Sequence, residues 1–306
     1  MNPVESKPEL AAGVQPAGTI PVQASAGPWV QMWQRLRRNT TAMVALWTLV
    51  VIVILCVGGS ALFFKSQVKQ HLEIVRMPPG MSHLFGTDAL GRDVFQRTLC
   101  GGSISLLVGV VATLVAMIIG TAYGLISGLA GRSLDNFMMR VVDILYGFPF
   151  IAFVVLLSVI CGPSLLLLFV AIGAVEWLTT ARVVRGQVLG LKNQEFVLAA
   201  RACGAGTGRI LWHHLLPNVV GPVVIYASLT VPGIMLTEAV LSFLGLGVQA
   251  PISSWGSLIQ EGASNMEHSP WLLIFPGAFF VTTLLALNLL GDGLRDALDP
   301  RSSRSE

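Results

Sequence analysis

Charged residues are scarce in this sequence. Asp, Glu, Lys and Arg together make up 11% of its 306 residues, whereas hydrophobic residues make up 54%. A soluble domain of this length needs far more polar surface to face water. The composition therefore excludes an ordinary soluble globular protein and predicts a chain that lies mostly in lipid.

The common signatures of nucleotide binding and hydrolysis are missing as well. The phosphate-binding pattern G-x-x-x-x-G-K-[ST] does not occur, and neither do the H-E-x-x-H and G-x-S-x-G patterns of zinc and serine hydrolases. The adjacent His213 and His214 point to different sides of a helix, so we expect no metal site there. If the chain works with an ATPase, that ATPase must be another polypeptide.

Cysteine is rare and irregularly spaced. No two of the four cysteines stand in C-x-x-C spacing; they are Cys56, Cys100, Cys161 and Cys203. They fall in hydrophobic runs and on both aqueous faces. We therefore expect neither a disulfide framework nor a metal or redox site.

Long uncharged hydrophobic runs, by contrast, are abundant. A helix needs about 20 apolar residues to cross a bilayer core of roughly 30 Å, and the chain contains about six runs near this length. They are residues 42–64, 104–126, 144–160, 165–178, 219–240 and 271–290. The third and fourth are joined by a Cys-Gly-Pro turn into a predicted hairpin. The expected fold is an all-α polytopic membrane protein.

The distribution of basic residues predicts the orientation of the chain. Only the loop between the first two runs has basic residues on the outer side; they are Lys65, Lys69, Arg76, Arg92 and Arg97. Because cytoplasmic segments carry the excess of Lys and Arg, we expect both termini in the cytoplasm. Residues 1–30, rich in Pro, Ala, Gly and Gln, predict a disordered cytoplasmic tail, and residues 301–306 a short C-terminal tail.

The longest polar stretch between two runs is residues 179–218. Residues 195–202 favour a helix, which is interrupted by Gly204, Gly206 and Gly208. A short amphipathic helix follows over residues 209–216 and is expected to stop at Pro217. The pattern predicts a helix–turn–helix unit at the inner membrane surface.

Two roles for this unit are open from its residues alone. Small side chains let another protein approach the backbone closely, as a docking element requires. These small residues are Ala199, Ala200, Ala202, Gly204, Ala205 and Gly206. Alternatively, the unit is an ordinary loop held on lipid headgroups by Arg201 and Arg209.

The same stretch resembles the coupling loop of binding-protein-dependent ABC permeases, whose pattern is E-A-A, three residues, G, nine residues, I-x-L-P. The matching residues are Ala199, Ala200, Gly204, Leu216 and Pro217. Leu198 replaces the Glu of the pattern and His214 replaces the Ile, whereas Glu195 fits the E-F-x-x-A-A form of peptide permeases. The resemblance implies an ATPase-coupling loop over about 190–217. Its implied contact residues are Glu195, Ala199, Ala200, Gly204, Ala205, Gly206, Arg209 and Pro217.

Other motifs resemble the peptide and nickel branch of this family, above all its C-type oligopeptide permease subunits. They are FGTDALGRD (85–93), GFPF (147–150), an ESFLGLG-like run (238–247), SSWGSLIQEG (253–262) and GDGLRDALDP (291–300). Together they cover nearly all of the chain after the tail. The resemblance implies a MetI-like fold of type I importers, with an N-terminal span and external loop over 31–100 and a permease core over 101–300.

The resemblance also implies the partners. A homologous second permease subunit would complete the pathway, one or two ATPase subunits would bind ATP and magnesium, and an external substrate-binding protein would deliver a peptide. The chain itself would bind no cofactor, metal or nucleic acid and would sit among the lipids of a bacterial inner membrane. It would be a permease rather than an enzyme.

Two further groups of residues are candidate sites. Pro222, Pro232 and Gly233 weaken the fifth run, and Glu238 lies near its outer end, so Pro232, Gly233 and Glu238 are candidates for the pathway or an external gate. The outer segment that follows must receive the binding protein in an importer. Its candidates are Gln249, Trp255, Gln260 and Glu261; a re-entrant lid formed by PISSWGSL is the alternative.

Two smaller patterns predict packing. Gly120, Gly124 and Gly128 repeat on one face of the second run, as expected for close helix contact rather than for a pore. Before this run, Thr87 or Asp88 is expected to cap a short interfacial helix on which Asp93 pairs with Arg97.

Three rival interpretations remain open. The same architecture could carry dipeptides, nickel or an antimicrobial peptide. An ion-coupled secondary transporter would work through a broken fifth helix and paired acids in the membrane, for which Glu176 and Glu238 are few and far apart in sequence. A membrane scaffold without transport is the third.

Overall fold

The computed structural model describes residues 28–162 and 164–298. The predicted tails therefore lie outside the described residues, except for residues 28–30. These three begin a helix, α1 (Pro28–Arg38), so the expected tail ends earlier than residue 30.

The described residues are almost entirely helical, which confirms the predicted class. After α1 the elements are α2 (Thr40–Phe63), η1 (Leu72–Ile74), α3 (Val94–Leu129), α4 (Arg132–Tyr146), α5 (Phe150–Cys161), α6 (Leu165–Leu191), α7 (Glu195–Ala202), α8 (Thr207–Arg209), η2 (Ile210–Leu215), α9 (Leu216–Phe243), α10 (Trp255–Ser264) and α11 (Trp271–Leu298). This part of the chain contains no strand, only an isolated bridge between Thr87 and Asp93.

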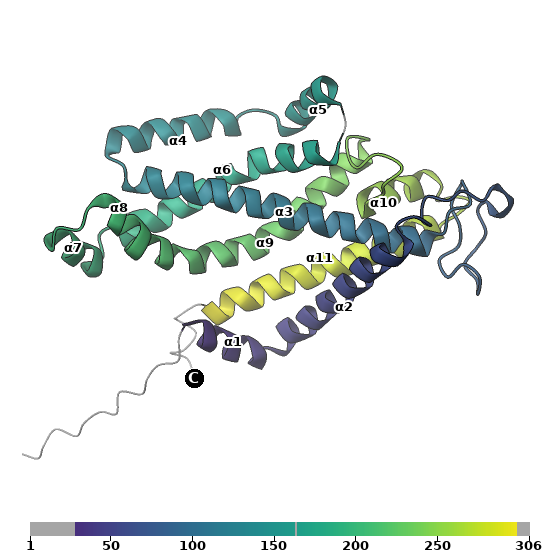
Figure 1. The fold of residues 1–306 in the computed structure, drawn as a ribbon, viewed down its shortest axis with the longest axis horizontal. Coiled ribbons are helices and arrows are strands. Elements are labelled where there is room, and N and C mark those ends of the chain that lie inside the picture. The colour runs from purple at the N-terminus through teal and green to yellow at the C-terminus, as the bar shows by residue number, and fades with distance from the viewer. Residues whose placement is uncertain (1–27, 163, 299–306) are drawn as a thin grey trace, which may run out of the picture.

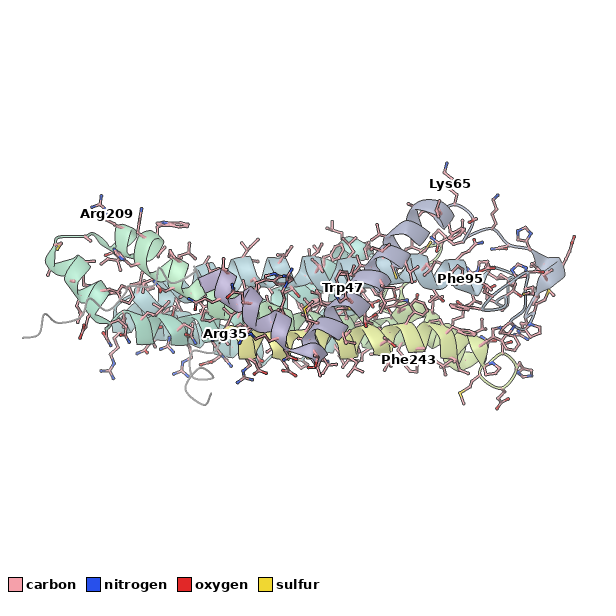
Figure 2. The ribbon with its side chains drawn as sticks, turned by 90° about the horizontal axis from the view of Figure 1, so that it is seen from below. Arg35, Trp47, Lys65, Phe95, Arg209 and Phe243 are labelled. Carbon is pink, nitrogen blue, oxygen red and sulfur yellow. The ribbon has the colours of Figure 1, made fainter. Side chains whose placement is uncertain are left out.

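Five helices are long and apolar enough to cross a membrane, or six if α4 and α5 together count as one bent span. They agree with the predicted count of about six. Figure 1 shows the long helices lying side by side along the molecule, with α7 and α8 at one end and α10 near the other. In Figure 2 the molecule is a flat slab with Arg209 toward the first of these ends and Lys65 and Phe95 toward the other.

The third predicted span is wrong as a single straight helix. Helix α4 ends at Tyr146 and α5 starts at Phe150, and the two are bent by 77°. Pro149 stands between them and has no N–H to continue the hydrogen-bond ladder, and its ring disfavours helical backbone at Phe148. Helix α5 alone has 12 residues, too few to cross a bilayer.

The closest helix pair is α3 with α6, and three glycines make it possible: Gly120, Gly124 and Gly128. A Cβ added at these positions would lie 2.5 Å from Thr180 Cβ, 2.6 Å from the Ala181 carbonyl oxygen and 2.6 Å from Val188 Cγ1, respectively. Such distances leave no room for a side chain. The prediction that these glycines serve helix packing is confirmed.

The N-terminal helices lie along the last one. Helix α2 packs against α11, and Leu36 of α1 and Ala42 of α2 form a small buried cluster with Ala297 near the C-terminal end of α11. Gly293 permits this contact, because a Cβ there would lie 2.4 Å from Ala42 Cβ. The extra N-terminal span is thus part of the same bundle.

Replacing Gly124 with alanine should destabilise the chain even though alanine favours helices. The added methyl group meets the Ala181 carbonyl, and overpacking of this kind costs about 1–3 kcal/mol. Gly186 in α6 has nothing within 4 Å of an added Cβ and provides the control. Thermal unfolding in detergent should show a lower midpoint for Gly124→Ala than for Gly186→Ala, and equal midpoints would contradict the packing argument.

Candidate functional site

Residues 195–217 form an exposed helix–turn–helix unit at the end of the molecule where Figure 1 labels α7 and α8. Helix α7 ends in a turn at Gly204, whose φ is +81°. The Gly204 N–H donates to the Arg201 carbonyl at 2.9 Å and the Ala205 N–H donates to the Ala200 carbonyl at 3.0 Å. This pair of bonds is a Schellman motif, in which the left-handed position favours glycine.

Nothing lies within 4 Å of a Cβ added at Gly204. The glycine is therefore required by backbone conformation, and the surface above it is open. A hollow of about 350 Å³ adjoins it, lined by Leu129, Arg201, Gly204, Ala205, Gly206, Thr207 and Ile210. A protruding side chain of another protein would fit into such a hollow.

The structure brings all the predicted coupling-loop residues to this one unit. The exposed ones are Glu195, Ala199, Gly204, Gly206, Arg209 and Pro217. Ala200 and Ala205 are half-buried beneath them. The outer side of the unit thus consists mainly of small side chains and backbone, with charges at its margins.

The predicted stop at Pro217 is wrong. From Thr207 the chain runs through α8 and the wide π-helical turn η2 directly into α9 without a break. Pro217 lies in the first turn of α9, where a missing N–H is tolerated, and the Asn218 side chain donates to the His214 carbonyl at 2.6 Å. The second half of the unit, from Thr207 onward, is therefore the beginning of a long helix rather than a separate short one.

The inner side of the unit is joined to the bundle by an apolar cluster. Its buried members come from α3, α6, α7, η2 and α9: Leu125, Val184, Val188, Val197, Ile210, Leu215 and Val219. Close-packed side chains transmit displacement because they cannot be compressed. A force on the outer side of the unit therefore reaches three long helices at once.

A polar network fixes the neighbouring helix α4, and sequence reasoning missed it. Asp135 accepts hydrogen bonds from Arg185 at 2.6 and 2.7 Å and from the Ser127 hydroxyl at 2.5 Å. Lys192 Nζ donates to the Gly128 carbonyl at 3.0 Å, near the end of α3. Asp135 and Arg185 are 50 positions apart in the sequence and meet only because the chain turns back between α4 and α6. No local sequence pattern therefore indicates this pair.

At the outer end, the candidate pathway residues of α9 are mostly internal. Pro232 and Glu238 are buried and Gly233 is exposed, while α9 continues through both Pro222 and Pro232. The Glu238 carboxylate faces the interior of the chain, where serine hydroxyls surround it. Neither buried side chain lines an open channel.

The candidate binding-protein contacts divide in a similar way. Trp255, predicted to be exposed, is fully buried and donates from Nε1 to the Thr98 carbonyl at 2.9 Å. An indole ring is a large apolar body with one donor, so it packs between helices when a carbonyl is in reach. Gln249 is exposed, and Gln260 and Glu261 are half-buried at the surface.

Glu261 belongs to a buried charge cluster with the loop before α3. Asp88 is fully buried and accepts from Arg92 Nε at 2.6 Å and from Arg97 at 2.5 Å. Arg97 also contacts Glu261 at 2.9 Å. The expected pairing of Arg97 with Asp93 is therefore wrong.

The Asp93 side chain makes other contacts than the predicted pair with Arg97. It is the N-cap of α3, accepting from the Gln96 N–H at 3.0 Å, and it pairs with His83 at 2.8 Å. Neither Thr87 nor Asp88 caps a helix; the Thr87 hydroxyl donates to the Ile74 carbonyl instead. The N-cap geometry directs the Asp93 side chain toward the first turn of α3 and away from Arg97.

Replacing Asp88 with alanine should strongly destabilise the outer end. The change leaves Arg92 and Arg97 with only the partly exposed Glu261 as a partner, and breaking a buried ion pair costs about 3–5 kcal/mol. The matched control is Glu267→Ala, because Glu267 is an exposed acid of the same outer segment. Thermal unfolding in detergent should separate the two variants, whereas similar midpoints would show that the cluster is solvated.

In the part of the chain that the structure describes, no group of three or more His, Cys, Asp or Glu residues is placed to hold a metal ion. Residues 195–217 present an exposed surface of small side chains and backbone on one side and apolar contacts with three long helices on the other.

Two known protein families match parts of the chain. Residues 120–304 match the family described as binding-protein-dependent transport system inner membrane component, and residues 27–79 match the N-terminal TM domain of oligopeptide transport permease C. The first match covers the chain from Gly120 within α3 through α11, and the second covers α1 and α2.

Three relatives cover most of the chain. The oligopeptide transport system permease protein OppC of Haemophilus influenzae is 49% identical over 275 residues, which is 89% of this chain and 88% of the relative. OppC of Escherichia coli is 49% identical over 276 residues, 88% of this chain and 91% of the relative. The dipeptide transport system permease protein DppC of Bacillus subtilis is 46% identical over 273 residues, 89% and 85% of the two chains. With its two matched regions, its helical bundle and these relatives, the chain belongs to the family of inner-membrane permease components of binding-protein-dependent transport systems.

Proposed function

We propose that this chain is the C-type permease subunit of an ATP-driven importer of oligopeptides. The observation that carries the proposal is the exposed unit 195–217, whose open glycine turn faces outward and whose other side is packed on α3, α6 and α9. A permease without a nucleotide site of its own needs such a surface to receive force. The 49% identity to oligopeptide permeases supports the cargo.

The same proposal assigns the partners. One or two ATPase subunits, which bind ATP and magnesium, dock on residues 195–217. A homologous permease subunit supplies the other half of the pathway, and an external binding protein delivers the peptide. Both termini and the docking unit lie in the cytoplasm, in keeping with the basic residues at this end, which include Arg201 and Arg209.

Movement rather than chemistry is the contribution of this chain. When ATP draws the ATPase subunits together, they displace α7 and η2, and the cluster around Val197 and Leu215 passes the displacement to the long helices. The external face closes or opens as these helices shift. A peptide released by the binding protein then passes between the two permease subunits.

The structure counts against the ion-coupled alternative. That mechanism was expected to work through a break in the fifth predicted span, yet α9 is continuous across Pro222 and Pro232. Its acid Glu238 is buried among hydroxyl groups of this chain and is not open to a pathway. Dipeptides are the second candidate cargo, because the Bacillus dipeptide permease is nearly as similar at 46% identity.

Purification of the chain from its own membrane in mild detergent tests the partners. Mass spectrometry should identify a second permease and at least one ATPase with a phosphate-binding loop. Gly204→Leu should abolish co-elution of the ATPase, because leucine is strained at φ +81° and covers the open surface. Gly131→Leu is the control, since Gly131 is also exposed and open but has an ordinary φ of −65°. A chain that elutes without an ATPase under every gentle condition refutes the importer.

Uptake measurements test the cargo. Cells that lack this chain should fail to take up labelled tri-alanine and regain uptake when the chain is restored. Excess tri-alanine or tetra-alanine should compete more strongly than excess di-alanine. Stronger competition by the dipeptide would assign the chain to dipeptide transport instead.

A further inference from the structure

Glu238 is the most deeply buried acid near the outer end of α9, with 0% of its surface exposed. Within the described residues, its side chain bonds to three serine hydroxyls and to no basic group. Ser242 and Ser254 each donate to Oε1 at 2.7 Å, and Ser105 donates to Oε2 at 3.3 Å. These serines belong to three different elements: α9 itself, the N-cap of α10, and α3.

Burial of a carboxyl group at this position is unfavourable in free energy. Its removal from water is unfavourable unless hydrogen bonds replace the lost hydration, and within a membrane protein the cost is higher still. A leucine would fill a similar volume without that cost. The acid therefore indicates a requirement for these particular hydroxyl contacts, since a polar network permits only one relative placement of the elements that it joins.

The hydroxyls carry the connection into the first turn of α10. The Ser254 hydroxyl accepts from the Ser257 N–H at 3.2 Å and so caps this helix. The Ser105 hydroxyl accepts from the Trp255 N–H at 3.0 Å while it donates to Glu238. One carboxylate thus orients the start of α10 relative to both α3 and α9.

Glycines bring the elements close enough for these bonds. A Cβ at Gly256 of α10 would lie 2.7 Å from Ala239 Cα on α9. A Cβ at Gly102 of α3 would lie 2.5 Å from the Trp255 ring. The short distances between helices and the serine contacts are therefore parts of one arrangement.

Helix α9 connects this arrangement to the other end of the molecule. With α8 and η2 it forms one helical segment, Thr207–Phe243, of 37 residues that begins in the docking unit. Helix α10 carries Gln260 and Glu261 on the outer surface. The docking unit and helix α10, at opposite ends of the molecule, are thus linked by the segment Thr207–Phe243 and by the hydrogen bonds between Glu238 and the three serines.

We propose that Glu238 is a positioning residue that holds α10 on the outer ends of α3 and α9 through Ser105, Ser242 and Ser254, so that the external face and the ATPase-docking unit move together. The inference rests on the proposed function. It adds a residue that touches neither peptide nor ATPase but sets whether the movement of α9 reaches the surface that receives the binding protein.

The test compares E238L, E238Q and S254A with the control S103A in the full complex. Ser103 lies two residues from Ser105 in α3, but its hydroxyl donates only to the Cys100 carbonyl of its own helix. Uptake of labelled tri-alanine is divided by the amount of complex, measured as co-eluting ATPase. Normalised uptake should fall about tenfold in E238L and about threefold in S254A, because hydrogen bonds between Glu238 and the serine hydroxyls are lost. E238Q should stay within about twofold, since its amide oxygen still accepts from Ser242 and Ser254.

Hydrogen exchange of the same complexes gives a readout independent of transport. Amides of residues 255–258 should exchange faster in E238L and S254A than in the wild type and S103A, while those of α6 remain unchanged. Normalised uptake equal to that of S103A, or unchanged exchange in α10, overturns the positioning role. If E238L fails to assemble, S242A decides the question, because Ser242 donates to Glu238 but does not cap α10. Wild-type cells without tri-alanine uptake would refute the proposed function, whereas the exchange measurement would still test the junction.

Discussion

The close contact between α3 and α6 is the constraint on which the remaining structure depends. Lipid provides no hydrophobic force to press helices together, so their association rests on van der Waals contact over matched surfaces. The three glycines of α3 allow the two helices to stay in close contact from Gly120 to Gly128. Once α3 and α6 are adjacent, their ends near residues 195–217 supply members of the apolar cluster beneath that unit and of the network around Asp135.

The outer end is organised by a different force. There the buried carboxyl groups of Asp88 and Glu238 each accept hydrogen bonds from several donors, so polar contacts fix the relative position of loops and short helices. Apolar packing alone would permit several placements of α10 at similar energy. Apolar contacts therefore join the long helices along their length, whereas polar contacts fix the positions of the loops and short helices.

Much of the fold could be predicted because its causes are local. Runs of uncharged residues mark the spans, and Gly204, Gly206 and Gly208 mark the turn of the helix–turn–helix unit. The errors arise where the cause is distant or depends on backbone geometry. The buried Trp255 donates a hydrogen bond to the Thr98 carbonyl, which is 157 positions away in the sequence. Arg97 pairs with Glu261, which is 164 positions away. Pro217 was expected to end a helix, but a π-helical turn before it lets the helix continue.

The continuity of α8, η2 and α9 has a geometric consequence. The segment Thr207–Phe243 that they form has 37 residues and is about 55 Å long, longer than the roughly 30 Å core of a bilayer, so both ends project beyond the hydrocarbon. A rod that tilts about a point within the membrane moves its two ends in opposite directions. Displacement of the end at Thr207 is then accompanied by the opposite displacement of the end at Phe243. One continuous segment thus relates movements on the two sides of the membrane with opposite sign.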